Sequence, residues 1–189
     1  MEKNILISLL FFVSLSASAM IKDSVTLPDT ETVQNHALVL NGMGFRKATF
    51  LKLKVYAAGL YLEQKSQNSE EIINSPGVKK VVMKFMRNVS VGDVRGAWDK
   101  SFKALCDAKC NSTQPDIQKQ IQRLQDAMED LKEGDIMSYT FGPDQLEIAI
   151  RGEKKTQIPA AGLLAQLVLK TWIGANPPNA ELKEGLLGL

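Results

Sequence analysis

The feature that most constrains the fold is a continuous β-patterned run over residues 41–63, with glycines near both of its ends. Apolar and polar side chains alternate through its middle, as they do in a strand with one buried face. We expect two strands, His36–Phe45 and Thr49–Glu63, joined by a tight connection. Gly42 and Gly44 are interpreted as parts of a turn that precedes a single arginine.

That arginine, Arg46, and the nearby Tyr56 are the pair with the clearest chemical potential. Strict alternation would place Tyr56 on the same strand face as Lys52 and Lys54. A bulge or a strong twist near Ala57–Gly59 would turn it toward Arg46. On one face of a sheet, the two side chains would present donors to an oxyanion or a carboxylate against an apolar wall.

Periodicity and turn signals predict the remaining elements. We expect a single domain of the α+β class, with a layer of helices on one face of a large antiparallel sheet. Its predicted elements are a short extended piece at 24–27, a helix at 68–74 capped by Asn68 or Ser69, a strand at 78–86, a helix at 91–106 capped by Ser90, a helix at 115–132, a hairpin of strands 136–141 and 145–151, a helix at 158–173 and a last short helix ending at Leu187.

Residues 1–19 have the pattern of a signal peptide. Lys3 precedes an apolar segment over Ile5–Leu15, and Ala17–Ala19 forms a small-residue cleavage site. The alternative is a membrane anchor, but the apolar segment is about a dozen residues, short of the roughly 20 that span a bilayer. We predict cleavage after Ala19, a mature domain over residues 20–189, and a periplasmic or secreted location.

Charge and cysteine content exclude several classes of function. The formal net charge is +2, and the basic residues are interspersed with acidic ones, so the sequence does not indicate nucleic-acid binding. The two cysteines, Cys106 and Cys110, have three residues between them. In an oxidising compartment we expect a structural disulfide. The alternatives are a redox pair, which usually has two intervening residues, and a metal site, which needs further ligands.

Other catalytic motifs are missing from the sequence. His36 is the sole histidine and has no nucleophile-elbow motif to partner it. No ligand spacing indicates a metal, and the glycines at 42 and 44 lack the pattern of a phosphate-binding loop, so no cofactor is predicted. Arg46 remains, either as a surface arginine or as a planar donor for a carboxylate or enolate oxygen. Four aromatic residues are candidates for an apolar wall beside it: Tyr61, Phe85, Trp98 and Trp172.

Three phrases of the sequence resemble the chalcone isomerase family, and most closely its bacterial chalcone isomerase-like branch. They are Gly-x-Gly-x-Arg at 42–46, Val-Tyr-x-x-Gly-Leu-Tyr-Leu at 55–62, and Trp-x-Gly-x-x-Pro at 172–177. They occur in the family's order, and the resemblance covers most of the mature chain. It implies an open-faced β-sandwich with a ligand cleft between the large sheet and the helices.

The resemblance also implies what the candidate residues do. In the family's enzymes, the arginine that matches Arg46 stabilises charge developing on the substrate, while a threonine that helps hold a water corresponds to Tyr56. Arginine with tyrosine is instead similar to the family's non-catalytic relatives, in which the pair binds a fatty-acid carboxylate. The expected function is therefore binding of a fatty acid or similar apolar carboxylate through Arg46 and Tyr56. The alternatives are an isomerase (intramolecular lyase) that uses the same two residues in catalysis, and a structural or partner-binding protein.

Overall fold

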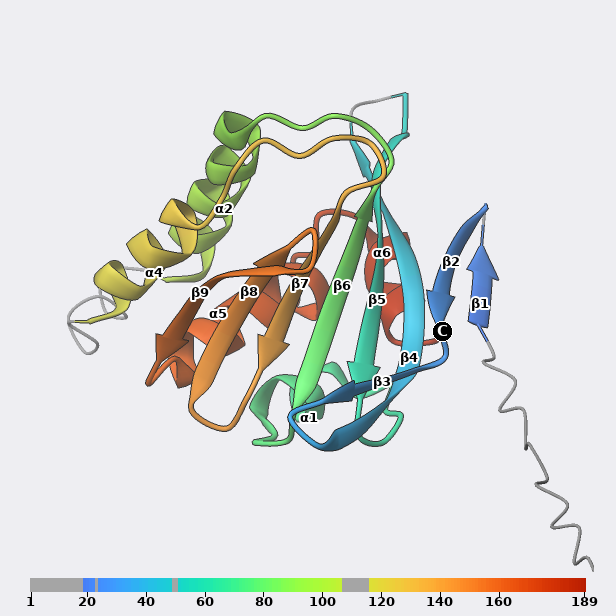
Figure 1. Cartoon of the computed structure of the whole chain (residues 1–189), viewed down its shortest axis with the longest axis horizontal. Helices are drawn as coiled ribbons and strands as arrows, with labels where there is room; N and C mark the ends of the chain where they lie inside the picture. Colours follow the sequence, from blue (N-terminus) through green and yellow to red (C-terminus); the bar gives the residue numbers. More distant parts are fainter. Residues whose placement is uncertain (1–18, 23, 49–50, 107–115) are drawn as a thin grey trace, which may run out of the picture.

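A seven-stranded, entirely antiparallel sheet forms the centre of the protein (Figure 1). The computed structural model describes residues 19–22, 24–48, 51–106 and 116–189. Spatial order follows chain order, so each strand pairs with the next along the chain. The strands are β3 (Thr30–Val33), β4 (His36–Ala48), β5 (Leu53–Leu62), β6 (Lys79–Phe85), β7 (Ile136–Phe141), β8 (Gln145–Ile150) and β9 (Glu153–Pro159).

Helices cover one face of this sheet, and a small two-stranded ribbon of β1 and β2 lies beside β4 (Figure 1). The predicted α+β class, with a helical layer on a large antiparallel sheet, is confirmed. The ribbon consists of β1 (Ala19–Lys22) and β2 (Val25–Pro28), and the helices are α1 (Ser69–Asn74), α2 (Val91–Leu105), α4 (Ile117–Asp126), α5 (Gly162–Ile173) and α6 (Ala180–Leu186).

Alternate residues of β5 belong to two hydrophobic cores, one on each face of the sheet. Ala58 and Leu60 join the larger core beneath the helices. Ala57 and Tyr61 join the smaller core with the β1–β2 ribbon, to which Leu27 contributes. The period-2 alternation of a strand thus supplies two buried faces here, which explains why nearly the whole of β5 is apolar.

The glycines of β4 lie within the strand, so the predicted turn at these positions is wrong. Helix α6 packs so closely on β4 that a Cβ on Gly42 would come within 2.2 Å of the Gly185 carbonyl oxygen. A Cβ on Gly44 would lie 2.5 Å from the Leu182 carbonyl oxygen. Both glycines are required by the approach of a helix backbone to a strand backbone, rather than by a bend in the chain.

One predicted helix is shorter in the structure than its apolar spacing indicates. The helix expected at 115–132 ends at Asp126, although Met128 and Leu131 remain buried. Leu131 leaves the helix because its backbone exchanges hydrogen bonds with that of Val89, at 2.8 and 2.9 Å. Met128 and Leu131 keep the apolar spacing of a helix because both are buried. The backbone of Leu131, however, bonds to Val89 and not to the preceding helical turn.

Strand β9 was not predicted, and its last apolar residue, Ile158, was assigned to the following helix. The strand lies at the edge of the sheet and carries exposed or half-buried polar residues at most positions. An edge strand needs little apolar alternation, and lysines there discourage pairing with other chains. Helix α5 begins at Gly162, after Ala160 adopts a left-handed φ of 51°.

Gly185→Ala should destabilise the protein because its new Cβ would lie 2.5 Å from the Met43 carbonyl oxygen and 2.6 Å from the Gly44 Cα. We expect a loss of about 1–3 kcal/mol from overpacking, measured by urea unfolding. The matched control is Gly96→Ala in α2, where a Cβ meets nothing within 4 Å. That change should stabilise by about 0.5–1 kcal/mol, and equal effects of the two substitutions would contradict the close-packing interpretation.

Candidate functional site

A cavity of about 770 Å³ lies between the sheet and helices α2 and α5. Its wall is made by β4 to β7, by the segment before α2, and by the loop that follows α5. The volume is in the range of pockets that hold small organic ligands. The residues lining it are Arg46, Ala48, Val55, Tyr56, Met83, Phe85, Arg87, Asn88, Val89, Asp93, Val94, Ala97, Trp98, Lys100, Ser101, Met137, Tyr139, Thr171, Trp172, Asn176, Pro177 and Pro178.

Arg46 and Tyr56 are direct cross-strand partners, and both line the cavity. Partners in an antiparallel pair project from the same face, so the two side chains lie side by side. The register shifts next to them, because Lys47 pairs with Lys54 and leaves Val55 without a partner on β4. A bulge was predicted, but at Ala57–Gly59; its position at Val55 separates Tyr56 from the face that carries Lys54.

The hydroxyl of Tyr56 has a defined orientation. Trp172 donates its indole Nε1–H to the Tyr56 Oη at 3.1 Å, so the tyrosine proton is directed to another acceptor. In the described part of the chain, no acceptor takes that proton. Burial raises the pKa of Tyr56 to about 12, although the Trp172 hydrogen bond and the charge of Arg46 both act to lower it. Tyr56 is therefore a neutral donor at physiological pH.

The strand segment that carries Arg46 is anchored on both sides. The Asn179 amide donates to the Phe45 carbonyl at 3.0 Å and accepts from the Lys47 N–H at 3.3 Å. The Arg46 guanidinium is half-buried and donates to the Lys47 carbonyl oxygen. Its other N–H groups bond to none of the described residues, which leaves a planar set of donors for a carboxylate.

The deep end of the cavity is aromatic. Trp98, Tyr139 and Trp172 meet edge to face, with ring centroids 5.3–5.8 Å apart. Phe85 extends this surface toward the polar pair, its ring 5.6 Å from that of Tyr56. Such contacts hold the rings in fixed orientations and provide an apolar surface for a ligand.

The exposed rim of the cavity carries more positive than negative charge. Arg87 and Lys100 line it from the segment after β6 and from α2, and Asp93 is the acidic residue among those that line it. With Arg46 at the inner edge, the excess of cations favours an anionic ligand over a cationic one.

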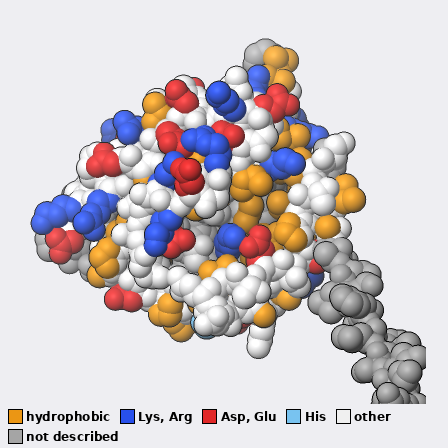
Figure 2. All heavy atoms as spheres, in the orientation of Figure 1, with side chains coloured by type: hydrophobic (Ala, Val, Ile, Leu, Met, Phe, Trp, Pro, Cys, Tyr) orange, Lys and Arg blue, Asp and Glu red, His pale blue; other side chains and the backbone are white. Residues whose placement is uncertain are grey.

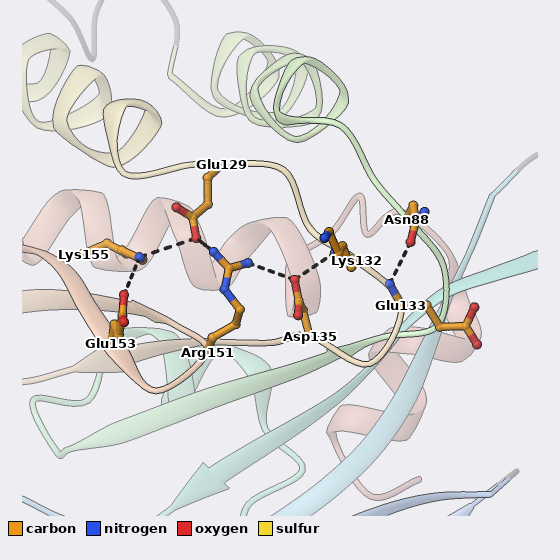
Figure 3. Close-up of polar contacts among 8 residues, drawn as sticks. All are labelled: Asn88, Glu129, Lys132, Glu133, Asp135, Arg151, Glu153 and Lys155. Carbon is orange, nitrogen blue, oxygen red and sulfur yellow. Dashed lines mark hydrogen bonds and ion pairs between the residues drawn. The ribbon is translucent and has the colours of Figure 1, made fainter.

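A network of ion pairs stabilises the loop over residues 128–135, which borders this rim (Figure 3). Arg151, at the end of β8, contacts Asp135 at 2.9 Å and also Glu129, which lies 3.5 Å from Lys155. The loop over residues 128–135 in turn pairs with the Val89 segment. Glu133 completes the link by donating its backbone N–H to the Asn88 side chain at 2.9 Å. The network thus positions Asn88 and Val89 on the cavity wall.

The structure brings together most, but not all, of the predicted site residues. Phe85, Trp98 and Trp172 line the cavity with Arg46 and Tyr56. Tyr61 does not, because it projects to the opposite face and donates to the Pro28 carbonyl at 2.9 Å.

Other candidates lie away from the cavity or are not placed. His36 is exposed, with Nδ1 2.6 Å from the Glu63 carboxylate. Cys106 is buried at the end of α2, whereas Cys110 lies outside the described residues, so their disulfide stays a prediction.

Sequence reasoning missed Tyr139 and the hydrogen bond made by Trp172. Tyr139 occupies an inward position of β7, where it has the sequence signature of ordinary core. The Trp172 contact joins residues 116 positions apart, and nothing local to either residue signals it. Among the residues described, no group of three metal-binding side chains is assembled, and no helix has the length and hydropathy of a membrane span.

The raised pKa of Tyr56 predicts a loss of stability at high pH. The unfolded chain releases this proton near pH 10 and the folded protein near pH 12, so the stabilisation is complete below pH 10 and is lost between those values. Urea midpoints across this range should fall more steeply for the wild type than for Tyr56→Phe. Phenolate absorbance of the folded protein gives a second measurement, and ionisation of Tyr56 at its ordinary pKa would contradict its burial.

Comparison with known proteins gives the family. The model of the family described as chalcone isomerase-like matches residues 19–188. The crystal structure of a fatty-acid binding protein of Arabidopsis thaliana superposes with a TM-score of 0.71 at 16% sequence identity, covering 90% of this chain and 96% of that one. At that identity the likeness establishes a shared fold. No curated protein matches in sequence. From the family match, which spans nearly the whole described chain, we conclude that this chain belongs to the chalcone isomerase-like family.

Proposed function

We propose that the protein binds a fatty acid or a similar apolar carboxylate in the cavity between the sheet and helices α2 and α5. The observation that carries this proposal is the pairing of Arg46 with Tyr56 at one edge of an aromatic hollow. The guanidinium supplies charge and parallel donors, and the phenol supplies a neutral donor. A ligand with an anionic head and an apolar body matches both parts of the site.

The electrostatics support an anion that is bound rather than transformed. A carboxylate beside Arg46 forms charge-assisted hydrogen bonds, which are stronger than bonds between neutral groups. Tyr56 retains its proton because its pKa is about 12, so it donates to the anion and does not act as a base near neutral pH. The fatty-acid binding protein of Arabidopsis thaliana that shares this fold is consistent with such a ligand.

The apolar part of the ligand would lie against Phe85, Trp98 and Trp172. Each methylene removed from water contributes about 0.8 kcal/mol. Affinity for a series of straight-chain acids should therefore rise roughly fourfold per methylene until the cavity is filled. Calorimetric titration with acids from octanoate to laurate measures this slope, and a flat series would contradict burial of the chain.

Replacement of Arg46 tests the polar end of the site. Because hydrogen bonds to charged groups are worth about 1.5–3 kcal/mol, Arg46→Met should weaken laurate binding by roughly 10- to 100-fold. Tyr56→Phe removes a neutral donor and should cost roughly 2- to 10-fold. Native mass spectrometry and calorimetry measure both effects, with Arg123→Met as the matched control, because Arg123 is an exposed arginine of α4 that does not line the cavity.

Dodecanol provides the decisive control ligand, since it has the same chain as laurate without the charge. Its affinity should change little in Arg46→Met. Equal losses for acid and alcohol would show that the substitution damages the fold instead of the carboxylate site. Recovery of clean protein with no affinity for laurate-sized acids would overturn the proposal. Turnover of an enone such as a chalcone, lost in Arg46→Met, would favour the isomerase alternative.

We further propose that the protein is exported and loses residues 1–19. The support is the sequence pattern of a short apolar segment followed by Ala17-Ser18-Ala19. The mature protein should begin at Met20, and it should be recovered outside the cytoplasm. Amino-terminal sequencing of the protein from its producing cell tests this, and an intact Met1 in all of the recovered protein would contradict it.

A further inference from the structure

The end of the β4–β5 hairpin exposes two neighbouring leucines. Leu51 is 62% exposed and Leu53 is 40% exposed. The described residues on the two sides of this connection lie at the top of Figure 1, beyond the main body of the sheet. Figure 2 shows hydrophobic and basic side chains close together at that end, with acidic side chains beside them. Exposed apolar side chains that gather at one projecting turn mark an interaction surface more often than isolated ones do.

The same hairpin end is basic. Residues 46–54 contain Arg46, Lys47, Lys52 and Lys54 and no acidic residue. Glu181 approaches Lys47 to 3.7 Å, and the Lys54 Nζ lies 4.8 Å from the Phe45 ring centroid. Even with Glu181 included, cations outnumber anions around the two leucines. Exposed leucines with cationic neighbours are complementary to a lipid bilayer, which has an apolar interior and, where its lipids are anionic, a negatively charged surface.

This hairpin also forms part of the cavity. Leu53 is the cross-strand partner of Ala48, and Ala48 lines the cavity together with Arg46 and Val55. Leu53 therefore lies beside the cavity wall, and Leu51 is two residues further along the hairpin. A ligand that leaves an apolar phase at the hairpin would reach the Arg46 guanidinium without crossing the molecule.

We propose that Leu51 and Leu53 insert into the surface of an anionic lipid bilayer, with Lys52 and its basic neighbours contacting the headgroups, so that the cavity exchanges its ligand with the membrane. The exchange rests on the proposed binding of an apolar acid, whereas the docking does not. An apolar acid partitions strongly into lipid, so a binding protein that docks there meets its ligand where it is concentrated.

Co-sedimentation with vesicles tests the docking. The full chain should bind vesicles of equal parts phosphatidylcholine and phosphatidylglycerol, and should bind pure phosphatidylcholine more weakly. Leu51→Ser with Leu53→Ser should reduce binding to the anionic vesicles by roughly tenfold or more, since two apolar side chains are lost. The matched control is Ile136→Ser, which removes a 43% exposed residue elsewhere. Equal binding by the double variant and the wild type would overturn the proposal.

A reporter placed at the hairpin separates insertion from contacts made by other parts of the chain. Leu51→Trp should shift its emission to the blue when the anionic vesicles are added, and Ile136→Trp should not. The native Trp98 and Trp172 are buried and line the cavity, so the wild type with the same vesicles is measured alongside to subtract their contribution. High salt should weaken the binding because it screens the contacts of the lysines with the headgroups. No shift at Leu51→Trp on vesicles that bind the protein would overturn the proposal.

The affinity for laurate in solution separates this proposal from the proposed function. The double leucine variant should keep its laurate affinity and lose vesicle binding. If laurate does not bind but docking depends on the leucines, the acid-binding function fails and the docking stands. If the wild type is instead a dimer that the double variant converts to a monomer, with vesicle binding unchanged, the leucines contact a second copy and the membrane proposal fails.

Discussion

The close contact between β4 and α6 is the constraint on which both the fold and the candidate site depend. Gly42 and Gly44 occupy alternate positions on the helix-facing side of β4, and α6 fills the space that side chains would otherwise take. Arg46 is the next residue on that side, just beyond the helix. Asn179, at the start of α6, then bonds to the backbone on both sides of it. The Gly-x-Gly-x-Arg motif therefore corresponds to one packing arrangement. The two glycines allow α6 to pack closely on β4, and the arginine lies just beyond the end of α6.

A bulge at Val55 keeps a lysine away from the polar pair. Tyr56 alternates with Ala58 and Leu60 and therefore faces the helices, beside Arg46 and within reach of the Trp172 indole N–H. Without the bulge, Lys54 would project from the same face as Tyr56; with it, Lys54 pairs with Lys47 and lies over the Phe45 ring on the opposite face. The arrangement couples the sheet to α5 through one hydrogen bond. It also explains how the phenol remains protonated, because burial against the helix layer outweighs the opposing effects of Arg46 and Trp172 on its pKa.

The cavity is polar at one edge and apolar deeper inside, and this difference supports both proposals, ligand binding and membrane docking. Cationic and neutral donors lie at one edge, and the aromatic side chains of Trp98, Tyr139 and Trp172 lie deeper. The outer end of the same hairpin continues the wall into a basic, leucine-bearing tip. The apolar acid that we propose as the ligand would find complementary chemistry in the pocket, and the bilayer that we propose as its source would find it at the leucines of the hairpin. The ion-pair network around Arg151 holds the opposite rim in place.

Features that depend on near neighbours could be predicted from the amino-acid sequence alone. Side-chain periodicity identified β5, β6, the β7–β8 hairpin and α2, and the caps at Asn68 and Ser90 are confirmed because a cap is made within one helical turn. Arg46 and Tyr56 were proposed as site residues from their chemistry as well as from motif resemblance. Long-range packing established three further features: Arg46 and Tyr56 share a face, α6 packs on Gly42 and Gly44, and Leu131 pairs with Val89 instead of continuing α4. Each of these outcomes depends on a backbone distant in the chain, which local spacing cannot specify.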